Sequence, residues 1–265
     1  MGIQLLALVI ACSSSPAAET RLRDGWVKLR GGEYRIGDAD DDRASPPHEI
    51  ALPTFWMRRT ETTVDEYAAC VQDGACEPLP PDKVPSRCNW LAREERGDHP
   101  MNCLSWPMAQ DYCRWLGGRL PTESEWEYAA RSRGQRGPYP WGDAEPSCER
   151  AHYKGCEPER TLPVCSRPAG NTEQGLCDMA GNAYEWTLDS YRDNYRDHPT
   201  HGGATFVDSE FKALRGGGVG SDEPLTVYNR AFHAPGFYYS GMGVRCAFGP
   251  GPSARDQSRP VHTPD

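Results

Sequence analysis

Two carboxylates flank a glycine in the middle of the chain. Asp178 and Glu185 lie on either side of Gly181 in the segment 177–190, CDMAGNAYEWTLDS. Because glycine permits a tight turn or a close backbone approach, both carboxylates can converge on one point. Ca²⁺ is held in this way, by carboxylate oxygens together with backbone carbonyls of a sharp turn. An acidic, solvated loop anchored by a buried Trp186 explains the same residues equally well.

Other residues with metal-binding or catalytic potential form no familiar pattern. Of the seven histidines, only His198 and His201 are close in sequence, within HPTHGG. A solvent-exposed pair is a better interpretation than a pair of metal ligands. The sequence contains no G-x-S-x-G, Walker loop or H-E-x-x-H motif. It therefore gives no sign of a serine hydrolase, a P-loop enzyme or a zinc protease.

Short strands are expected in the first quarter of the chain. Residues 26–29 and 34–37 alternate in polarity around Gly31, which predicts a hairpin. Residues 50–57 predict a further strand, interrupted at Pro53. The acidic run 38–43 lacks the glycine and the distal Glu of an EF-hand, so a solvated turn is favoured over a calcium loop.

Three helices are predicted by capping signals at their N-termini. They are expected to cover about 63–71, 105–116 and 123–131. In the third helix, Trp126 and Ala130 are expected to form the buried stripe. Glu123 and Glu127 are expected to face outward or to pair with Arg131.

Composition limits both the architecture and the partners. A length of 265 residues allows one large domain with tails. The net charge of −9 and the lack of a basic run argue against a nucleic-acid partner. Apolar residues make up only 37%, so the core needs other support, which 11 cysteines can supply.

The N-terminus predicts export. Residues 3–11 form an apolar run that is too short to span a bilayer but suits a secretory signal. Residues 9–12, VIAC, resemble the lipobox of bacterial lipoproteins, in which Cys12 becomes lipidated. Residues 1–4 carry no Lys or Arg, which departs from that pattern, and a slightly apolar, disordered N-terminus is the alternative. We expect a signal at 1–12, a tether at 13–24, a domain at 25–250 and a disordered tail at 251–265.

Several ordered blocks resemble the formylglycine-generating enzyme family, also called the sulfatase-modifying factor domain. DMAGNAYEW at 178–186 is similar to the family's D-M-x-G-N-x-x-E-W signature. GRLPTESEWEYAAR at 118–131, YPWGD at 139–143, LRGGG at 214–218 and GVRCAF at 243–248 follow the family's other blocks in order. The resemblance implies an α+β, loop-rich fold of the formylglycine-generating-enzyme type, similar to C-type lectins and stapled by disulfides.

The resemblance also implies a calcium site at the glycine turn. Its ligands would be the side chains of Asp178 and Glu185 and the backbone carbonyls of Gly181 and Ala183. The family places another calcium site nearer residue 152, but His152 stands where the family has Asn. We therefore expect one structural Ca²⁺.

Ten cysteines remain when Cys12 is set aside, and the sequence has no C-x-x-C. An exported chain favours disulfides, but the sequence alone leaves their connectivity open. The family resemblance implies a long-range bridge from Cys113 to Cys246. Neighbouring cysteines would then pair as Cys70–Cys76, Cys88–Cys103, Cys148–Cys156 and Cys165–Cys177.

The family's catalytic residues are the decisive difference. Its enzymes use two cysteines, five residues apart, to bind Cu(I) and to oxidise a substrate cysteine with O₂. These positions fall on Ser221 and Thr226, and no cysteine lies between Cys177 and Cys246. Since Cu(I) prefers soft thiolates, bound copper is not expected.

The sequence therefore favours a non-catalytic binding or scaffold module of the bacterial cell envelope, attached to the membrane only through a lipid anchor. Its partner would be a protein or a small molecule that the sequence does not identify. The alternatives are a purely structural envelope component and a metal-dependent oxidase of the formylglycine-generating and sulfoxide-synthase superfamily that acts on a thiol substrate. The sequence leaves enzymatic activity undecided.

Overall fold

The computed structural model describes residues 25–82, 85–135, 137–222 and 225–250. The predicted signal, the lipobox with Cys12, the tether and the tail 251–265 lie outside the described residues. Among the residues that are described, no helix is long and apolar enough to cross a membrane.

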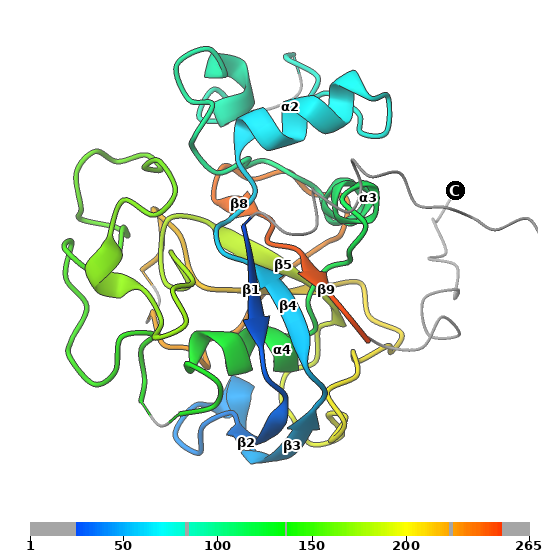
Figure 1. Ribbon diagram of the computed structural model, residues 1–265, viewed down its shortest axis with the longest axis vertical. Coiled ribbons are helices and arrows are strands. Elements are labelled where there is room, and N and C mark those ends of the chain that lie inside the picture. The colour runs from blue at the N-terminus through cyan, green and yellow to red at the C-terminus, as the bar shows by residue number, and fades with distance from the viewer. Residues whose placement is uncertain (1–24, 83–84, 136, 223–224, 251–265) are drawn as a thin grey trace, which may run out of the picture.

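Three small sheets, connected by long loops, form the framework (Figure 1). The first has the order β1-β4-β9, with β1 (Trp26–Leu29), β4 (Phe55–Arg58) and β9 (Ala247–Phe248). The second pairs β2 (Gly32–Ile36) with β3 (His48–Leu52). The third has the order β7-β6-β5-β8, with β5 (Tyr184–Ser190), β6 (Lys212–Arg215), β7 (Ala231–His233) and β8 (Met242–Gly243).

The predicted hairpin between the first two strands is wrong. β1 pairs with β4, and β2 pairs with β3, so the chain changes sheets at Gly31. A Cβ at Gly31 would lie 2.2 Å from the carbonyl oxygen of Leu52. Only glycine allows this close passage of two backbones, and the glycine that suggested a hairpin turn instead permits a crossing.

The three predicted helices are confirmed as α2 (Val64–Gln72), α3 (Trp106–Trp115) and α4 (Glu123–Ala130). Short 3₁₀ turns lie at η1 (Asp42–Ala44), η2 (Asn89–Ala92) and η3 (Pro168–Gly170). Thr63 and Thr122 each accept a bond from the backbone three residues on, and each forms a complete capping box. Residues 38–43 form a turn around η1, as predicted, in which the Asp41 side chain caps the 3₁₀ helix.

All eight residues of α4 are buried, because the helix contacts β2, β5 and β6. The prediction that Glu123 and Glu127 face outward is therefore wrong. The Glu127 carboxylate pairs with Arg131 at 2.8 Å, as the sequence suggested, and also with Arg215 at 2.7 Å. Glu123 pairs with Arg230 at 2.7 Å and with Arg215 at 3.1 Å.

The strand β5 lies between the two largest apolar clusters. One cluster contains Trp186 and residues of α2 and α3, and the other contains Trp126 of α4 and residues of β2, β3 and β4. Both tryptophans are fully buried. The glycine turn at 178–183 enters β5 directly, so its position is set by the centre of the core.

The five disulfides implied by the family resemblance are confirmed. The described cysteines pair as Cys70–Cys76, Cys88–Cys103, Cys113–Cys246, Cys148–Cys156 and Cys165–Cys177. Cys113–Cys246 joins α3 to the segment between β8 and β9 and closes a loop of 133 residues. The other four bridges staple local loops.

The entropy of loop closure predicts that these bridges contribute very differently to the free energy of unfolding. Replacing both Cys113 and Cys246 by Ser should lower the free energy of unfolding by about 3 kcal/mol more than replacing both Cys70 and Cys76, whose loop spans 6 residues. Urea unfolding followed by tryptophan fluorescence measures both. Equal unfolding midpoints for the two double variants would contradict the entropic argument.

Candidate functional site

The glycine turn before β5 has a backbone that few residues adopt. Asp178, Gly181 and Asn182 have φ values of 54°, 88° and 61°. A Cβ at Gly181 would lie 2.6 Å from the carbonyl oxygen of His152. The turn therefore requires a glycine here and packs directly against the loop that carries His152.

Glu185 faces the protein interior and forms a buried ion pair. Its carboxylate accepts bonds from Arg245 at 2.7 and 3.0 Å and from the indole nitrogen of Trp126 at 2.6 Å. The side chains of Glu185 and Arg245 are both 0% exposed. Arg245 also donates to the backbone carbonyls of Arg59 and Cys177. The pair thus ties the segment between β8 and β9 to α4, to the end of β4 and to the glycine turn.

A third carboxylate lies beside this pair. Glu61 accepts bonds from the Asn182 amide at 2.9 Å and from the backbone nitrogen of Ala183 at 3.0 Å. Burial, reinforced by the charges of Asp178 and Glu185, raises the pKa of Glu61 well above its usual range. Burial also raises the pKa of Asp178, although its carboxylate accepts a bond from the backbone nitrogen of Cys165 at 2.6 Å.

This arrangement does not form a calcium cage. Ca²⁺ takes six to eight oxygen ligands, whereas both Glu185 oxygens contact Arg245. Among the described residues, no group of three or more His, Cys, Asp or Glu is placed to hold a metal ion. Calcium binding by Asp178, Gly181, Ala183 and Glu185 would require Glu185 to turn away from Arg245, and it stays a prediction.

His152 has a different role from the metal ligand that the family places there. Its Nε2 lies 2.9 Å from the carbonyl oxygen of Pro158 and 2.8 Å from that of Arg160. The imidazole is 2% exposed and cross-links its own loop. A side chain engaged in this way holds the loop directly, through hydrogen bonds.

Ser221 and Thr226, to which the family resemblance assigns the cysteine positions, lie on the loop between β6 and β7. Ser221 Oγ accepts a bond from the backbone nitrogen of Gly218 at 2.7 Å, and its own backbone nitrogen donates to the Gly218 carbonyl at 2.9 Å. Thr226 is buried. All ten cysteines within the described ranges are in disulfides, so that part of the chain offers no thiolate to Cu(I).

Ser221 lines a surface cleft of about 550 Å³. Tyr139, Tyr153 and Leu225 supply its apolar walls, and Lys154 and Asp222 form an ion pair at its edge. Both charged side chains are more than half exposed. The cleft therefore combines two aromatic rings, a hydroxyl and two opposite charges, which suits binding of a polar ligand with an apolar part.

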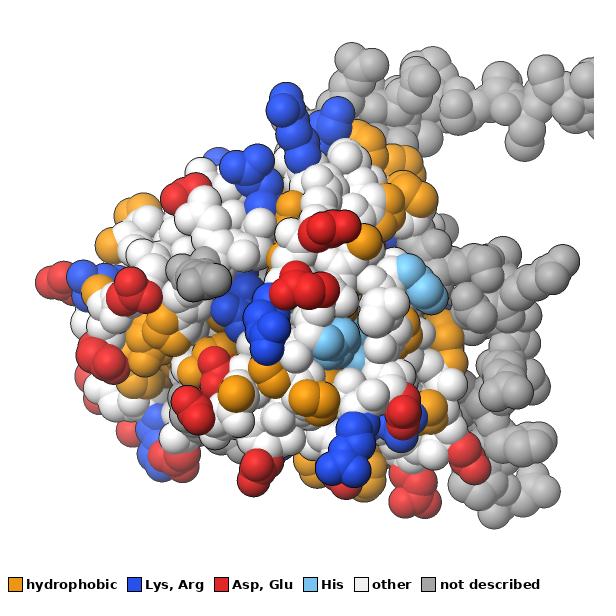
Figure 2. Space-filling view, turned by 90° about the horizontal axis from the view of Figure 1, so that it is seen from below, with side chains coloured by type: hydrophobic (Ala, Val, Ile, Leu, Met, Phe, Trp, Pro, Cys, Tyr) orange, Lys and Arg blue, Asp and Glu red, His pale blue; other side chains and the backbone are white. Residues whose placement is uncertain are grey.

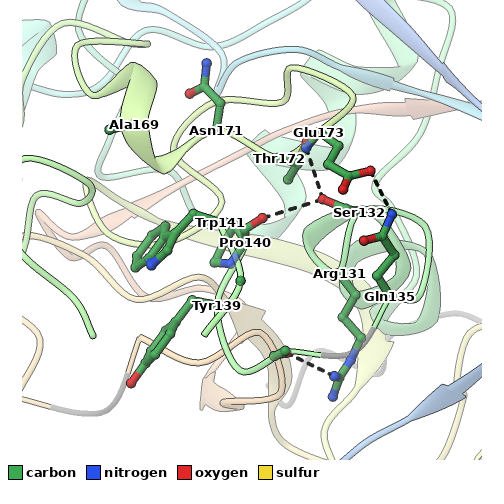
Figure 3. A pocket seen from close by; sticks show the side chains of 12 residues that line it. Arg131, Ser132, Gln135, Tyr139, Pro140, Trp141, Ala169, Asn171, Thr172 and Glu173 are labelled. Carbon is green, nitrogen blue, oxygen red and sulfur yellow. Dashed lines mark hydrogen bonds between the residues drawn. The ribbon is translucent and has the colours of Figure 1, made fainter. Parts of the chain in front are cut away.

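Tyr139 also lines a smaller pocket, of about 280 Å³ (Figure 3). The rings of Tyr139 and Trp141 stack with centroids 5.3 Å apart, and both side chains line this pocket. Its polar groups bond to one another: Ser132 Oγ accepts from the Glu173 backbone, and Gln135 donates to the Glu173 carboxylate. The two pockets therefore share Tyr139, whose ring stacks on Trp141 of the smaller one.

The histidine prediction is wrong for one residue of the pair. His201 is exposed, but His198 is only 8% exposed and packs against the rings of Tyr195 and His48. Burial lowers the pKa of His198 to about 4. Spacing in the sequence does not predict the contact between His48 and His198, because these two residues are far apart in the chain.

Sequence reasoning also missed the partners of the glycine turn. Arg245 stands within the GVRCAF block, and nothing in its sequence neighbourhood indicates that its partner is Glu185. Glu61 follows β4 in an ordinary-looking TETT segment, and nothing in its sequence neighbourhood predicts that it meets Asn182.

The fold and the glycine turn define a disulfide-stapled domain of the formylglycine-generating-enzyme type. Residues 13–249 match the family described as "Sulfatase-modifying factor enzyme 1-like domain", and the chain belongs to this family. The solved structure of PvdO from Pseudomonas aeruginosa is 27% identical and superposes with a TM-score of 0.71, covering 84% of this chain and 93% of PvdO.

Relatives with the same domain differ in their described activities. A formylglycine-generating enzyme of Streptomyces coelicolor is 30% identical over 93% of this chain and 96% of its own length. A bovine relative, named inactive C-alpha-formylglycine-generating enzyme 2, is 27% identical over 95% of this chain and 98% of its own length. Membership in the family therefore fixes the fold and leaves the activity to the site.

The ion pair beneath the glycine turn generates a stability prediction. Glu185→Gln should lower the free energy of unfolding of chelator-treated protein by about 3–5 kcal/mol, because Arg245 would stay buried without its anion. Glu33→Gln, at an exposed position of β2, is the matched control and should have little effect. Chemical unfolding of both variants measures this, and unfolding of Glu185→Gln at the wild-type midpoint would contradict it.

The Glu185→Gln variant also distinguishes stabilisation by bound calcium from stabilisation by the Glu185–Arg245 ion pair. If calcium binds at the turn, adding it should raise the melting temperature of the wild type but not of Glu185→Gln. An identical wild-type melting curve with calcium and with chelator would show that these residues bind no Ca²⁺.

Proposed function

We propose that this is an exported, envelope-attached domain that does not carry out the cysteine oxidation of its family and instead binds a ligand in the cleft beside Ser221. The observation that carries the proposal is that Ser221 and Thr226 stand where the family resemblance places the copper-binding cysteines, in a segment that has no cysteine between Cys177 and Cys246. A hydroxyl is a poor ligand for Cu(I), which favours thiolates, and the described cysteines are all bridged.

Two further observations support the proposal. Five disulfides in one domain are typical of proteins that fold in an oxidising compartment. The cleft beside Ser221 combines aromatic walls with the Lys154–Asp222 ion pair, so it can take a peptide or a small polar molecule. The existence of a relative named as inactive is compatible with this interpretation.

The absence of the family chemistry can be tested directly. Wild-type protein, supplied with copper, reductant, O₂ and a sulfatase-type cysteine peptide, should leave the peptide unoxidised and bind no Cu(I) tightly. Ser221→Cys with Thr226→Cys should recover Cu(I) affinity, because it restores two soft ligands. Ser221→Cys alone is the matched control. Formylglycine formed by the wild type, and absent from a boiled sample, would overturn the proposal.

Attachment to the membrane is a separate prediction. If Cys12 is lipidated, Cys12→Ala should move the protein from the membrane fraction to the soluble fraction after expression in a bacterial host. Mass spectrometry of the unreduced wild type should find an acylated N-terminal peptide and no alkylatable thiol in the domain. An unmodified Cys12 in membrane-fraction protein would contradict the anchor.

A further inference from the structure

The outer side of the β1-β4-β9 sheet is aromatic. Side chains alternate between the two sides of a strand, and Leu29, Phe55 and Met57 turn inward, where they are fully buried. The pairing register places the outward side chains in adjacent rows. These outward residues, called here the aromatic face, are Trp26 and Lys28 of β1, Trp56 and Arg58 of β4, and Phe248 of β9.

The three rings of the aromatic face pack together. The centroid of the Phe248 ring lies 6.2 Å from that of Trp26 and 5.8 Å from that of Trp56. Lys28 Nζ stands 5.4 Å from the Trp56 centroid. The Arg58 guanidinium stands 5.8 Å from the Trp26 centroid. Phe248 is 37% exposed and both tryptophans are partly exposed, so apolar area and positive charge reach the surface at the same place.

An apolar pocket of about 370 Å³ adjoins the aromatic face. Arg58 lines it, together with Tyr112 and Trp115 of α3 and the following Leu116. Trp115 and Leu116 are partly exposed, and Glu66 forms an ion pair with Arg58 at the same pocket. Contiguous exposed apolar surface marks an interaction site, and the pocket enlarges the apolar surface of the sheet.

The residue types of the aromatic face match a lipid surface. Tryptophan, with an apolar body and a polar N–H, is enriched at the headgroup level of membranes, and Lys extends its charged end from there. None of the five outward positions is acidic, although the whole chain has 38 Asp and Glu residues and a net charge of −9. Lys28 is exposed, so the face presents a positive charge that anionic headgroups attract.

The aromatic face also lies close in sequence to the predicted anchor. The predicted tether, 13–24, separates Cys12 from Gly25, and β1 begins at the next residue, Trp26. A flexible chain of this length has a root-mean-square end-to-end distance of about 20 Å. This step rests on the proposed attachment through Cys12, which would keep β1 near the membrane surface.

The figures show the same side of the molecule from two directions. β1, β4 and β9 lie in front of α4 and β5 in Figure 1, so the outer side of their sheet faces the viewer. Figure 2 is seen from below, which brings this side to its upper edge, where Lys and Arg side chains stand beside hydrophobic ones. A sheet side at the front of the molecule can meet an extended partner such as a membrane.

We propose that the aromatic face binds the surface of an anionic membrane, with Trp56 and Phe248 at the boundary between headgroups and acyl chains and Lys28 against the lipid phosphates. A lipid anchor at Cys12 would hold the chain at the membrane, and the aromatic face would set the orientation of the domain. None of the residues that line the cleft beside Ser221 belongs to the aromatic face, so the two surfaces use separate residues.

Equilibrium binding to vesicles tests the proposal without the anchor. The full chain carrying Cys12→Ala should co-sediment with vesicles of phosphatidylglycerol and phosphatidylethanolamine, and more weakly with phosphatidylcholine vesicles. Binding by a few side chains is reversible, as it is for a single acyl chain, so it is measured at about 0.1–1 mM lipid. The same weak binding is lost when a membrane fraction is washed, which is why Cys12→Ala is still expected in the soluble fraction of cells.

Three substitutions in this Cys12→Ala background locate the binding surface. Trp56→Ala and Phe248→Ala should each weaken vesicle binding by about fivefold or more, because each removes apolar area that the membrane would bury. Lys28→Glu, at an exposed position, should weaken binding to the anionic vesicles and leave phosphatidylcholine binding unchanged. Phe237→Ala is the matched control, because Phe237 is 43% exposed and lies outside the aromatic face.

A spectroscopic measurement removes the dependence on alanine variants that fold poorly. Vesicles with brominated acyl chains should quench tryptophan fluorescence of the Cys12→Ala protein, and Trp56→Phe, which keeps a ring, should reduce the quenched fraction. The proposal is wrong if the protein binds neither kind of vesicle, if all three variants bind as their parent does, or if the protein forms a dimer that Phe248→Ala abolishes. Attachment through Cys12 is decided separately by cell fractionation of the lipidated wild type.

Discussion

Three buried arginines organise this domain. Arg215, Arg230 and Arg245 are among its largest fully buried side chains, and each meets a buried carboxylate: Glu127, Glu123 and Glu185, respectively. Taking ions out of water is costly, so each arginine has to find all its partners in the folded state. The geometry of the guanidinium then fixes which segments come together.

This constraint explains how a chain with 37% apolar residues supports long loops. Arg215 and Arg230 bind α4 to the β6–β7 region through Glu123 and Glu127. Arg245 binds the last part of the chain to the glycine turn through Glu185. Because an unpaired buried charge is strongly destabilising, these pairs favour one arrangement of the loops, and the disulfides restrict the unfolded chain around the same arrangement.

Local signals in the sequence predicted local structure well. Thr63 and Thr122 predicted the starts of two helices, because a capping box is formed within four residues. Partners that are distant in sequence were less predictable. The outward-facing assignment of Glu123 failed because Arg215 and Arg230 approach from about 90 residues or more away. The prediction of a hairpin at Gly31 is wrong because β1 pairs with β4 and β2 pairs with β3, and periodicity within one segment does not reveal which other segment it pairs with.

In the candidate site, too, local motifs were predictable from the sequence and contacts between distant segments were not. The family motifs located the glycine turn and the Ser221 and Thr226 positions, and the disulfide pairing implied by resemblance was correct. Glu61 and the His48–His198 contact arise only when separate loops fold together, and neither residue stands in a motif. A motif identifies what a family shares, whereas a contact between two loops depends on packing that one sequence does not display.

The contacts of Ser221 and Thr226 bear on the proposed function, because they indicate whether the fold would need thiols at these positions. Ser221 holds its loop through two bonds with Gly218, and the ion pairs that join Arg215 to Glu123 and Glu127 of α4 involve neither residue 221 nor residue 226. On the proposed function, serine and threonine in place of two thiolates would remove soft ligands without exposing a buried charge. The ligand that we propose would then bind a cleft whose Tyr139, Lys154 and Asp222 lie outside the buried arginine pairs of the core.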